Sequence, residues 1–237
     1  MSVVLLRVGI DTGCGGIHSP LFEDGTFEFV PIPDRSGRDE RTYGNSRGLK
    51  GRTLAEYFPK RRRRGMTSQA MHVDPEFETF TYGDPTPPKR NLAQLRSGDL
   101  LVFYAGMEGW GHELPPALYL AGCFRVKLAG FATAFSDEQL RLEFGRNYHV
   151  RHPDVFADQR KRLVLIKGGR GSRLFQRAHL VGATVRRQNG SSWQLITPQM
   201  EKVFGKFGGI GSLQRSTPRW VEEPFATSAE ALIESFD

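Results

Sequence analysis

Short apolar runs separated by polar, glycine-rich segments dominate the hydrophobic pattern of this chain. Each run is bounded by turn residues, which predicts buried strands rather than long helices. The clearest runs are residues 3–6, 100–104, 118–126 and 163–167. Between the apolar segments 21–22 and 27–30, the sequence Glu-Asp-Gly-Thr predicts the turn of a hairpin.

Helical signals are fewer. Ser136 is typical of a helix N-cap, Asp137 and Glu138 suit the positive end of a helix, and Gly145 suits its C-terminal end. A helix is therefore predicted over residues 136–145. Weaker helical patterns lie at residues 53–57, 91–95, 172–181 and 228–236.

These elements predict an α+β fold with one mixed sheet. The chain has 237 residues, of which 38% are hydrophobic, and this is enough for a substantial core. The strand–loop–strand pattern that follows Gly98 and Asp99 resembles the core of PUA-like domains, so the sheet is expected to be mixed or a partial β-barrel flanked by helices. We expect a main domain over residues 1–182 and a C-terminal extension, residues 183–237, packed on it.

Composition narrows the classes of function. No apolar run approaches the ~18 residues of a membrane span, and the N-terminus has no signal-peptide pattern. Two cysteines, Cys14 and Cys123, do not suggest a disulfide framework, so a reducing cytoplasm is expected. The formal charge of +7 favours nucleic acid or a nucleotide as partner.

The densest charge is a run of four arginines, which is a candidate for contacts with nucleic-acid phosphates. The run consists of Arg61, Arg62, Arg63 and Arg64. A solvent-exposed loop without a ligand is the alternative for such a charge run.

The loop after the first strand combines polar groups with glycines. Asp11 is a candidate acid–base group or oxygen ligand, and Gly15, Gly16 and Ser19 are candidate ligand-binding residues because glycine lets a ligand approach the backbone closely. A tight connection with incidental polar residues is the alternative.

Two histidine–aspartate pairs carry the remaining candidate chemistry. His72 and Asp74 are two residues apart, so in an extended segment they lie on the same side. His152 and Asp154 form a second pair near a proline. These four residues are candidate catalytic groups. A divalent metal is a candidate cofactor, held by His72 and Asp74 with either Asp11 or His152.

Taken together, several segments resemble the nucleotide-modification-associated domain family, third type, over roughly residues 3–182. The segments that carry the resemblance are Asp11, Gly15-Gly16, Ser19-Pro20, Asp24-Gly25-Thr26, Pro31-Ile32-Pro33-Asp34, His72, Asp74-Pro75-Glu76, Gly98-Asp99-Leu100, Gly122, Val126, His152-Pro153 and Ser172-Arg173. The resemblance implies a component of a system that modifies nucleic-acid bases, with other base-modification enzymes as further partners. It also makes Ser172 and Arg173 candidate ligand-binding residues.

Two functions of different class stay open. An enzyme acting on a nucleotide or base needs its His and Asp groups to converge in one pocket. A non-catalytic reader of modified DNA or RNA needs stacking groups and a basic rim instead. Tyr104, Trp110 and Tyr148 would suit the reader.

The arginine run generates a first testable prediction. Affinity for DNA or RNA is expected to fall steeply as salt rises, because contacts with phosphates release bound counterions. Replacing residues 61–64 with alanine should weaken binding in fluorescence anisotropy titrations without unfolding the protein. Unchanged binding would remove the run from the binding site. Absence of binding even at low salt would instead indicate a free nucleotide or a protein partner.

Overall fold

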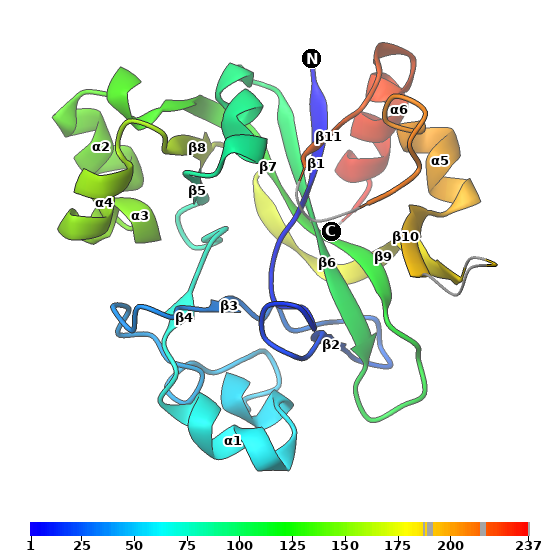
Figure 1. Cartoon of the computed structure of the whole chain (residues 1–237). Helices are drawn as coiled ribbons and strands as arrows, with labels where there is room; N and C mark the ends of the chain where they lie inside the picture. The colour runs from blue at the N-terminus through cyan, green and yellow to red at the C-terminus, as the bar shows by residue number, and fades with distance from the viewer. Residues whose placement is uncertain (187, 189–191, 214–216, 237) are drawn as a thin grey trace.

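A nine-stranded mixed sheet forms the centre of the protein in the computed structural model, which describes residues 1–186, 188, 192–213 and 217–236 (Figure 1). Its strands are β1 (Val3–Arg7), β2 (Ser19–Leu21), β5 (Thr81–Asp84), β6 (Leu100–Gly109), β7 (Ala117–Phe131), β8 (Val164–Gly168), β9 (Arg173–Arg186), β10 (Ser192–Ile196) and β11 (Arg219–Trp220). The main path runs β10-β9-β7-β6-β1-β11, and it is open at both ends.

A separate two-stranded sheet pairs β3 (Ile32–Pro33) with β4 (Met71–His72). The helices surround both sheets. They are η1 (Leu54–Tyr57), α1 (Lys60–Thr67), η2 (Pro87–Gln94), η3 (Ala132–Ala134), α2 (Asp137–Phe144), α3 (Tyr148–Arg151), α4 (Pro153–Gln159), α5 (Pro198–Phe204) and α6 (Glu223–Glu234). Among the described residues, none of these helices has the length and apolar composition needed to cross a bilayer.

Both faces of the central sheet are buried, which explains why its strands are continuous apolar runs. In β1, Val3 and Leu5 pack on one face with α5 and α6, whereas Val4 and Leu6 pack on the other with Leu92 of η2. β1 and β2 pair parallel with successive stretches of β6, so the loop over residues 8–18 leaves and rejoins the same edge.

β7 connects the central sheet to the part of the molecule that carries α2, α3 and α4. Its first half pairs with β6 and β9, and its second half pairs with β8, whose other edge holds β5. Leu140 and Phe144 of α2 pack against Leu163 and Leu165 beside β8. Figure 1 shows this helical group beside β5 and β8, across the sheet from α5 and α6.

The predicted α+β class and the mixed sheet are confirmed, and each of the four apolar runs lies largely within a strand. The helix at residues 136–145 is confirmed with its N-cap, because the Ser136 side chain accepts a hydrogen bond from the Gln139 backbone. At residues 23–26 a turn forms, although only a single bridge, Leu21 with Phe27, flanks it. The PUA-like likeness stays a prediction.

One helix prediction is wrong. Residues 173–181 belong to strand β9, which pairs with β7 over this stretch and with β10 only beyond it, at residues 182–186. Leu174 and Ala178 contact one apolar cluster, and Phe175 and Val181 belong to another, so the apparent helical spacing covers two opposite faces. Pairing with β7 and packing on both faces outweighed the local pattern.

The bounds or type of three other predicted elements also differ in the structure. The segment 91–95 lies mostly in the 3₁₀ helix η2, the last helix begins at Glu223, and the arginine run is helical within α1 rather than a loop. The division at residue 182 stays a prediction. Part of the expected extension, residues 187, 189–191, 214–216 and 237, lies outside the described residues.

The burial of Tyr104 generates a second prediction. Its side chain is fully buried in the core, and its hydroxyl donates to the Leu213 carbonyl at 3.1 Å. Tyr104→Phe should lower the free energy of unfolding by about 1 kcal/mol, as is typical of one lost hydrogen bond, and leave ligand affinity unchanged. Urea denaturation with a binding titration measures both quantities. If the Tyr104→Phe variant is as stable as the unchanged protein but binds the ligand more weakly, Tyr104 belongs to the ligand site.

Candidate functional site

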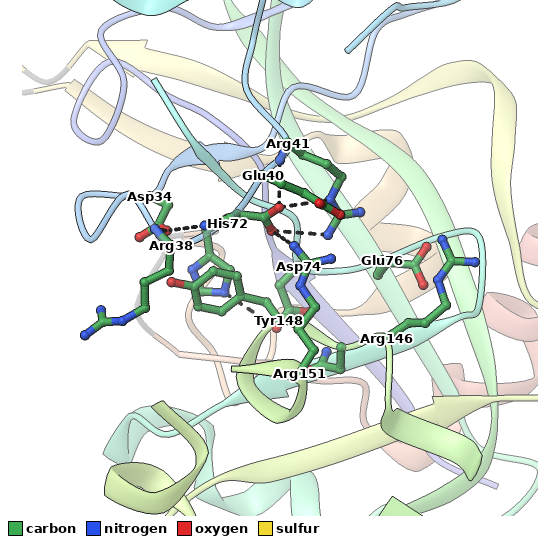
Figure 2. A network of polar contacts seen from close by, with 12 residues as sticks. Asp34, Arg38, Glu40, Arg41, His72, Asp74, Glu76, Arg146, Tyr148 and Arg151 are labelled. Carbon is green, nitrogen blue, oxygen red and sulfur yellow. Dashed lines mark hydrogen bonds and ion pairs between the residues drawn. The ribbon is translucent and has the colours of Figure 1, made fainter. Parts of the chain in front are cut away.

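Two histidines and an aspartate converge at one buried point. The His72 Nε2 atom lies 4.0 Å from Asp74 Oδ2, and His149 Nε2 lies 3.5 Å from the same oxygen. The side chains of Asp74 and His149 are each 5% exposed, and that of His72 is 21% exposed. Figure 2 shows His72 and Asp74, which come from one segment, beside Tyr148 of α3.

The extended segment around β4 places the first two groups. His72 pairs with Ile32 of β3, and Asp74 follows two residues later on the same side, as the spacing predicts. Met71 and Val73, which alternate with them, point the other way and pack into an apolar cluster with Ile10, Val30 and Tyr43. The alternation of an extended chain therefore turns both polar groups toward one space.

Close approach of α3 to β5 supplies the third group. The Asn147 side chain accepts a hydrogen bond from the His149 backbone at 3.1 Å and so caps α3. A Cβ on Gly83 of β5 would lie 2.9 Å from both Asn147 Oδ1 and His149 Cδ2. Only a residue without a side chain allows this packing. The Gly83 amide also donates to Asp74 Oδ2 at 2.8 Å.

The protonation pattern leaves lone pairs directed into the site. His149 Nδ1 lies 2.6 Å from Gln159 Oε1, and with the amide oriented this way Nδ1 carries a proton, so that the neutral form of the ring has its lone pair on Nε2. In the described part of the chain, His72 Nε2 and Asp74 Oδ1 are buried without a hydrogen-bond partner. Buried polar atoms without partners are rare and call for a missing ligand or ion.

Burial also shifts the acidities of these groups. It raises the pKa of Asp74 to about 6, against the opposing effect of the hydrogen bond and charge of His149. Burial, assisted by His149, lowers the pKa of His72 to about 3. At neutral pH the Asp74 group is therefore mainly a carboxylate and the His72 ring is neutral.

The cluster lines a cavity of about 340 Å³, a size typical of small-molecule sites. Its wall comes from the end of β1, from β3 and β4, from the end of β5 and from α3 and α4. The polar side chains in this wall are Arg7, His72, Asp74, Tyr82, Asp84, Thr86, Lys89, His149 and Gln159. Four larger hollows, of about 370 to 560 Å³, contain no histidine in their walls. The smaller cavity is therefore the one of these five that brings imidazole groups together with a carboxylate.

Tyr148 supports the cluster from outside. Its ring packs on His72 with the ring centres 3.9 Å apart, and its hydroxyl lies 3.1 Å from Ser36 Oγ. Ser36 Oγ in turn donates to Asp34 at 2.6 Å. This chain of contacts fixes the plane of the His72 ring.

A buried ion network lies beside this support (Figure 2). The Asp39 carboxylate, which is fully buried, pairs with Arg41 at 3.4 Å and with Arg151 at the end of α3. The network ties the segment after β3 to the helix that carries His149, and the Arg41 carbonyl accepts a hydrogen bond from the Met71 amide of β4 at 2.9 Å. Its role is to hold the two halves of the site together.

The first-loop residues lie near the cavity but do not line it. Asp11 accepts hydrogen bonds from the backbone of Gly13 and Cys14 at 2.9 and 3.0 Å. Its other oxygen lies 3.5 Å from Arg7, which does line the cavity. Asp11 therefore organises the turn and is linked to the cavity wall through Arg7.

The other first-loop candidates have structural surroundings. The Ser19 hydroxyl is buried and accepts from the Val30 backbone, while Gly15 packs on the side chain of Ile10. Gly16 has a φ of +78°, and a Cβ there would lie 2.0 Å from Arg62. The loop thus needs this glycine for its own conformation.

The second His–Asp pair lies on the far side of Tyr148. His152 contacts the Tyr148 ring at 4.9 Å between centres, and the exposed Asp154 pairs with Arg38 at 2.7 Å. Neither residue lines the cavity. His149, three residues before His152, occupies the position beside Asp74.

The last candidates lie elsewhere on the sheet. Ser172 accepts from the Arg125 backbone in the turn before β9, and Arg173 donates to the carbonyls of Ile233 and Phe236 at the end of α6. The structure does not bring Ser172, Arg173 or Tyr104 to the cavity.

Sequence reasoning missed His149, Gly83 and Gln159. Asn147 before Tyr-His was a signal for a helix N-cap, and a glycine inside the strand pattern Thr-Tyr-Gly-Asp was a signal for close backbone approach. No signal marks Gln159, because its role depends on where α4 ends.

Gly83 generates a third prediction. In Gly83→Ala, the added methyl would contact His149 and Asn147 at about 2.9 Å and push α3 away from β5. Stability should fall by about 1–3 kcal/mol, as for other overpacked sites, and the His149 imidazole signals in NMR spectra should shift. Gly65→Ala is the matched control, because a Cβ there meets nothing within 4 Å. Equal behaviour of both variants would contradict the close approach.

Comparison with known proteins agrees with the resemblance seen in the sequence. The family model described as nucleotide modification associated domain 3 matches residues 2–232. The comparisons with curated proteins and with solved structures returned no match. The matched range includes β4, β5 and α3, which position the clustered side chains. The family name associates these domains with nucleotide modification, and the chain belongs to the nucleotide modification associated domain 3 family.

Proposed function

We propose that this protein binds a nucleotide or modified base in the cavity of His72, Asp74 and His149 and processes it within a base-modification system. The observation that carries the proposal is the convergence of these three groups, with unpartnered buried atoms, in the wall of a cavity of about 340 Å³. Membership of the family supports a role in nucleotide modification, and the cavity supports this part of the molecule as the binding site.

The cluster suits a ligand that offers hydrogen-bond donors. Asp74 Oδ1 and His149 Nε2 are acceptors, and the edges of nucleobases present amino and ring N–H groups that match them. A carboxyl group with a pKa of about 6 beside the neutral imidazole of His72 can also exchange protons near neutral pH. Asp74 is therefore the proposed general base or acid, and the two histidines are proposed to orient the base and share its proton.

The fourth prediction tests binding at this cavity. A panel of canonical and modified nucleoside monophosphates would be titrated by calorimetry, and each mixture would then be analysed for new products by mass spectrometry. His149→Asn should reduce affinity for the bound nucleotide by about tenfold or more, because it leaves buried polar atoms of the complex unpaired.

His112→Asn is the matched control, since it removes an imidazole from a loop outside the cavity. It should bind as the unchanged protein does. Equal affinity of the His149 and control variants would place the nucleotide elsewhere, and absence of binding across the panel would overturn the proposal.

A non-catalytic reader of modified DNA or RNA is the second candidate, favoured by α1. Arg61 and Arg64 are exposed on this helix, whereas Arg62 packs over the Phe58 ring and Arg63 donates to the Glu56 carbonyl. Only the two exposed arginines are then proposed to meet phosphates. A double alanine variant at these positions that loses polynucleotide binding, in a protein that yields no product from any nucleotide, would favour the reader.

A further inference from the structure

We infer that His72, Asp74 and His149 form a binding site for one divalent first-row transition metal, with two imidazole nitrogens and one carboxylate oxygen as ligands. The inference rests on the proposed function and deepens it, because the same cavity would hold the metal and the nucleotide together. With an ion bound, these three side chains are its ligands, and the nucleotide meets the ion in place of the Asp74 and His149 acceptors. It differs from the metal site expected from the sequence in its third ligand, which is His149 rather than Asp11 or His152.

The spacing of the ligand atoms suits one ion. One atom from each of the three side chains lies within 4.8 Å of the other two. Two ligands of a tetrahedral ion at bond lengths of ~2.1 Å are separated by about 3.4 Å. The separation of 3.5 Å between His149 Nε2 and Asp74 Oδ2 already matches this value, and the 4.0 Å to His72 Nε2 needs only a small contraction.

The lone pairs provide an independent reason. Gln159 Oε1 lies 2.6 Å from His149 Nδ1, so Nε2, which faces Asp74 Oδ2 at 3.5 Å, is the nitrogen that the neutral ring presents to an ion. His72 Nε2 and Asp74 Oδ1 are also buried without hydrogen-bond partners among the described residues. Unpaired acceptors that meet in a buried site are costly. A cation at this point would satisfy them at once.

The surrounding residues resemble the outer shell of a metal site. Metal-binding histidines usually donate their other ring N–H to an acceptor that fixes the ring, and Gln159 provides this acceptor for His149. The Gly83 amide hydrogen-bonds Asp74 Oδ2, and the Tyr148 ring holds the plane of His72. Each ligand is thus oriented before an ion binds.

The donor set selects the class of metal. Imidazole nitrogen with one carboxylate suits Zn²⁺, Fe²⁺, Co²⁺ or Mn²⁺, whereas Mg²⁺ and Ca²⁺ prefer oxygen ligands alone. Three protein ligands leave coordination positions for water or a ligand in the cavity. In that position an ion would supply Lewis-acid chemistry to a bound nucleotide or water.

Metal titration of the full chain tests the site directly. Protein stripped with EDTA would be titrated with Co²⁺ and with Zn²⁺, with Mg²⁺ as the comparison ion. We expect one equivalent of Co²⁺ to give visible absorption bands, Zn²⁺ to displace it, and both ions to raise the melting temperature. Mg²⁺ at the same concentration should change neither the spectrum nor the melting temperature.

Variants locate the ion. His149→Ala and His72→Ala should each weaken Co²⁺ binding by about 100-fold or more, and Gln159→Leu, which removes only the positioning acceptor, by about 10- to 100-fold. His152→Ala is the matched control and should bind as the unchanged protein does, because His152 does not line the cavity. Circular dichroism of each metal-free variant would show that it is folded.

Two results would overturn the inference. One is the absence of both Co²⁺ bands and a melting shift in the unchanged protein, and the other is equal loss of affinity in His152→Ala and His149→Ala. Nucleotide calorimetry with and without Zn²⁺ separates this inference from the proposed function. If the protein binds metal but no nucleotide, the metal site is supported and the proposed function is contradicted. If it binds a nucleotide but no metal, the proposed function is supported and the metal site is contradicted.

Discussion

The length of β7 is the constraint on which the rest of the structure depends. Backbone groups in a buried strand must be paired on both edges. β6 and β9 pair with the first half of β7, and beyond them its second half takes β8 as a partner, which in turn takes β5. This extension carries β5 and the α2–α4 group to the end of β1. The cavity forms where that end meets β3 and β4.

The site then follows from packing at very short range. Gly83 lets α3 lie against β5, and α3 delivers His149 to the carboxylate that the β4 segment delivers from the opposite side. The buried pairing of Asp39 with Arg41 and Arg151 fastens these two segments together. Polar groups brought together in this way lose water, and the shifted acidities of Asp74 and His72 are the result.

The chain belongs to a family associated by name with nucleotide modification. The cavity provides convergent polar groups, and the exposed arginines of α1 lie on a separate element. The two functions proposed above, processing of a base and recognition of a polynucleotide, therefore depend on different parts of the chain. This separation makes the two proposed roles testable by independent variants.

The sequence alone determined the features that depend on neighbours along the chain. The apolar runs of β1, β6, β7 and β8, the Ser136 cap and the shared side of His72 and Asp74 all follow from local periodicity and local hydrogen bonding. Membership of a nucleotide-modification family was also visible in its motifs.

Only the tertiary structure decided which distant groups meet. Residues 172–181 fit a helical spacing, but in the fold residues 173–180 pair with β7 as part of strand β9. His149 and His152 are chemically equal in the sequence, and the close approach at Gly83 selected His149. Contacts across strands and between helices fix such choices, because burial and hydrogen-bond pairing act between segments that are far apart in the chain.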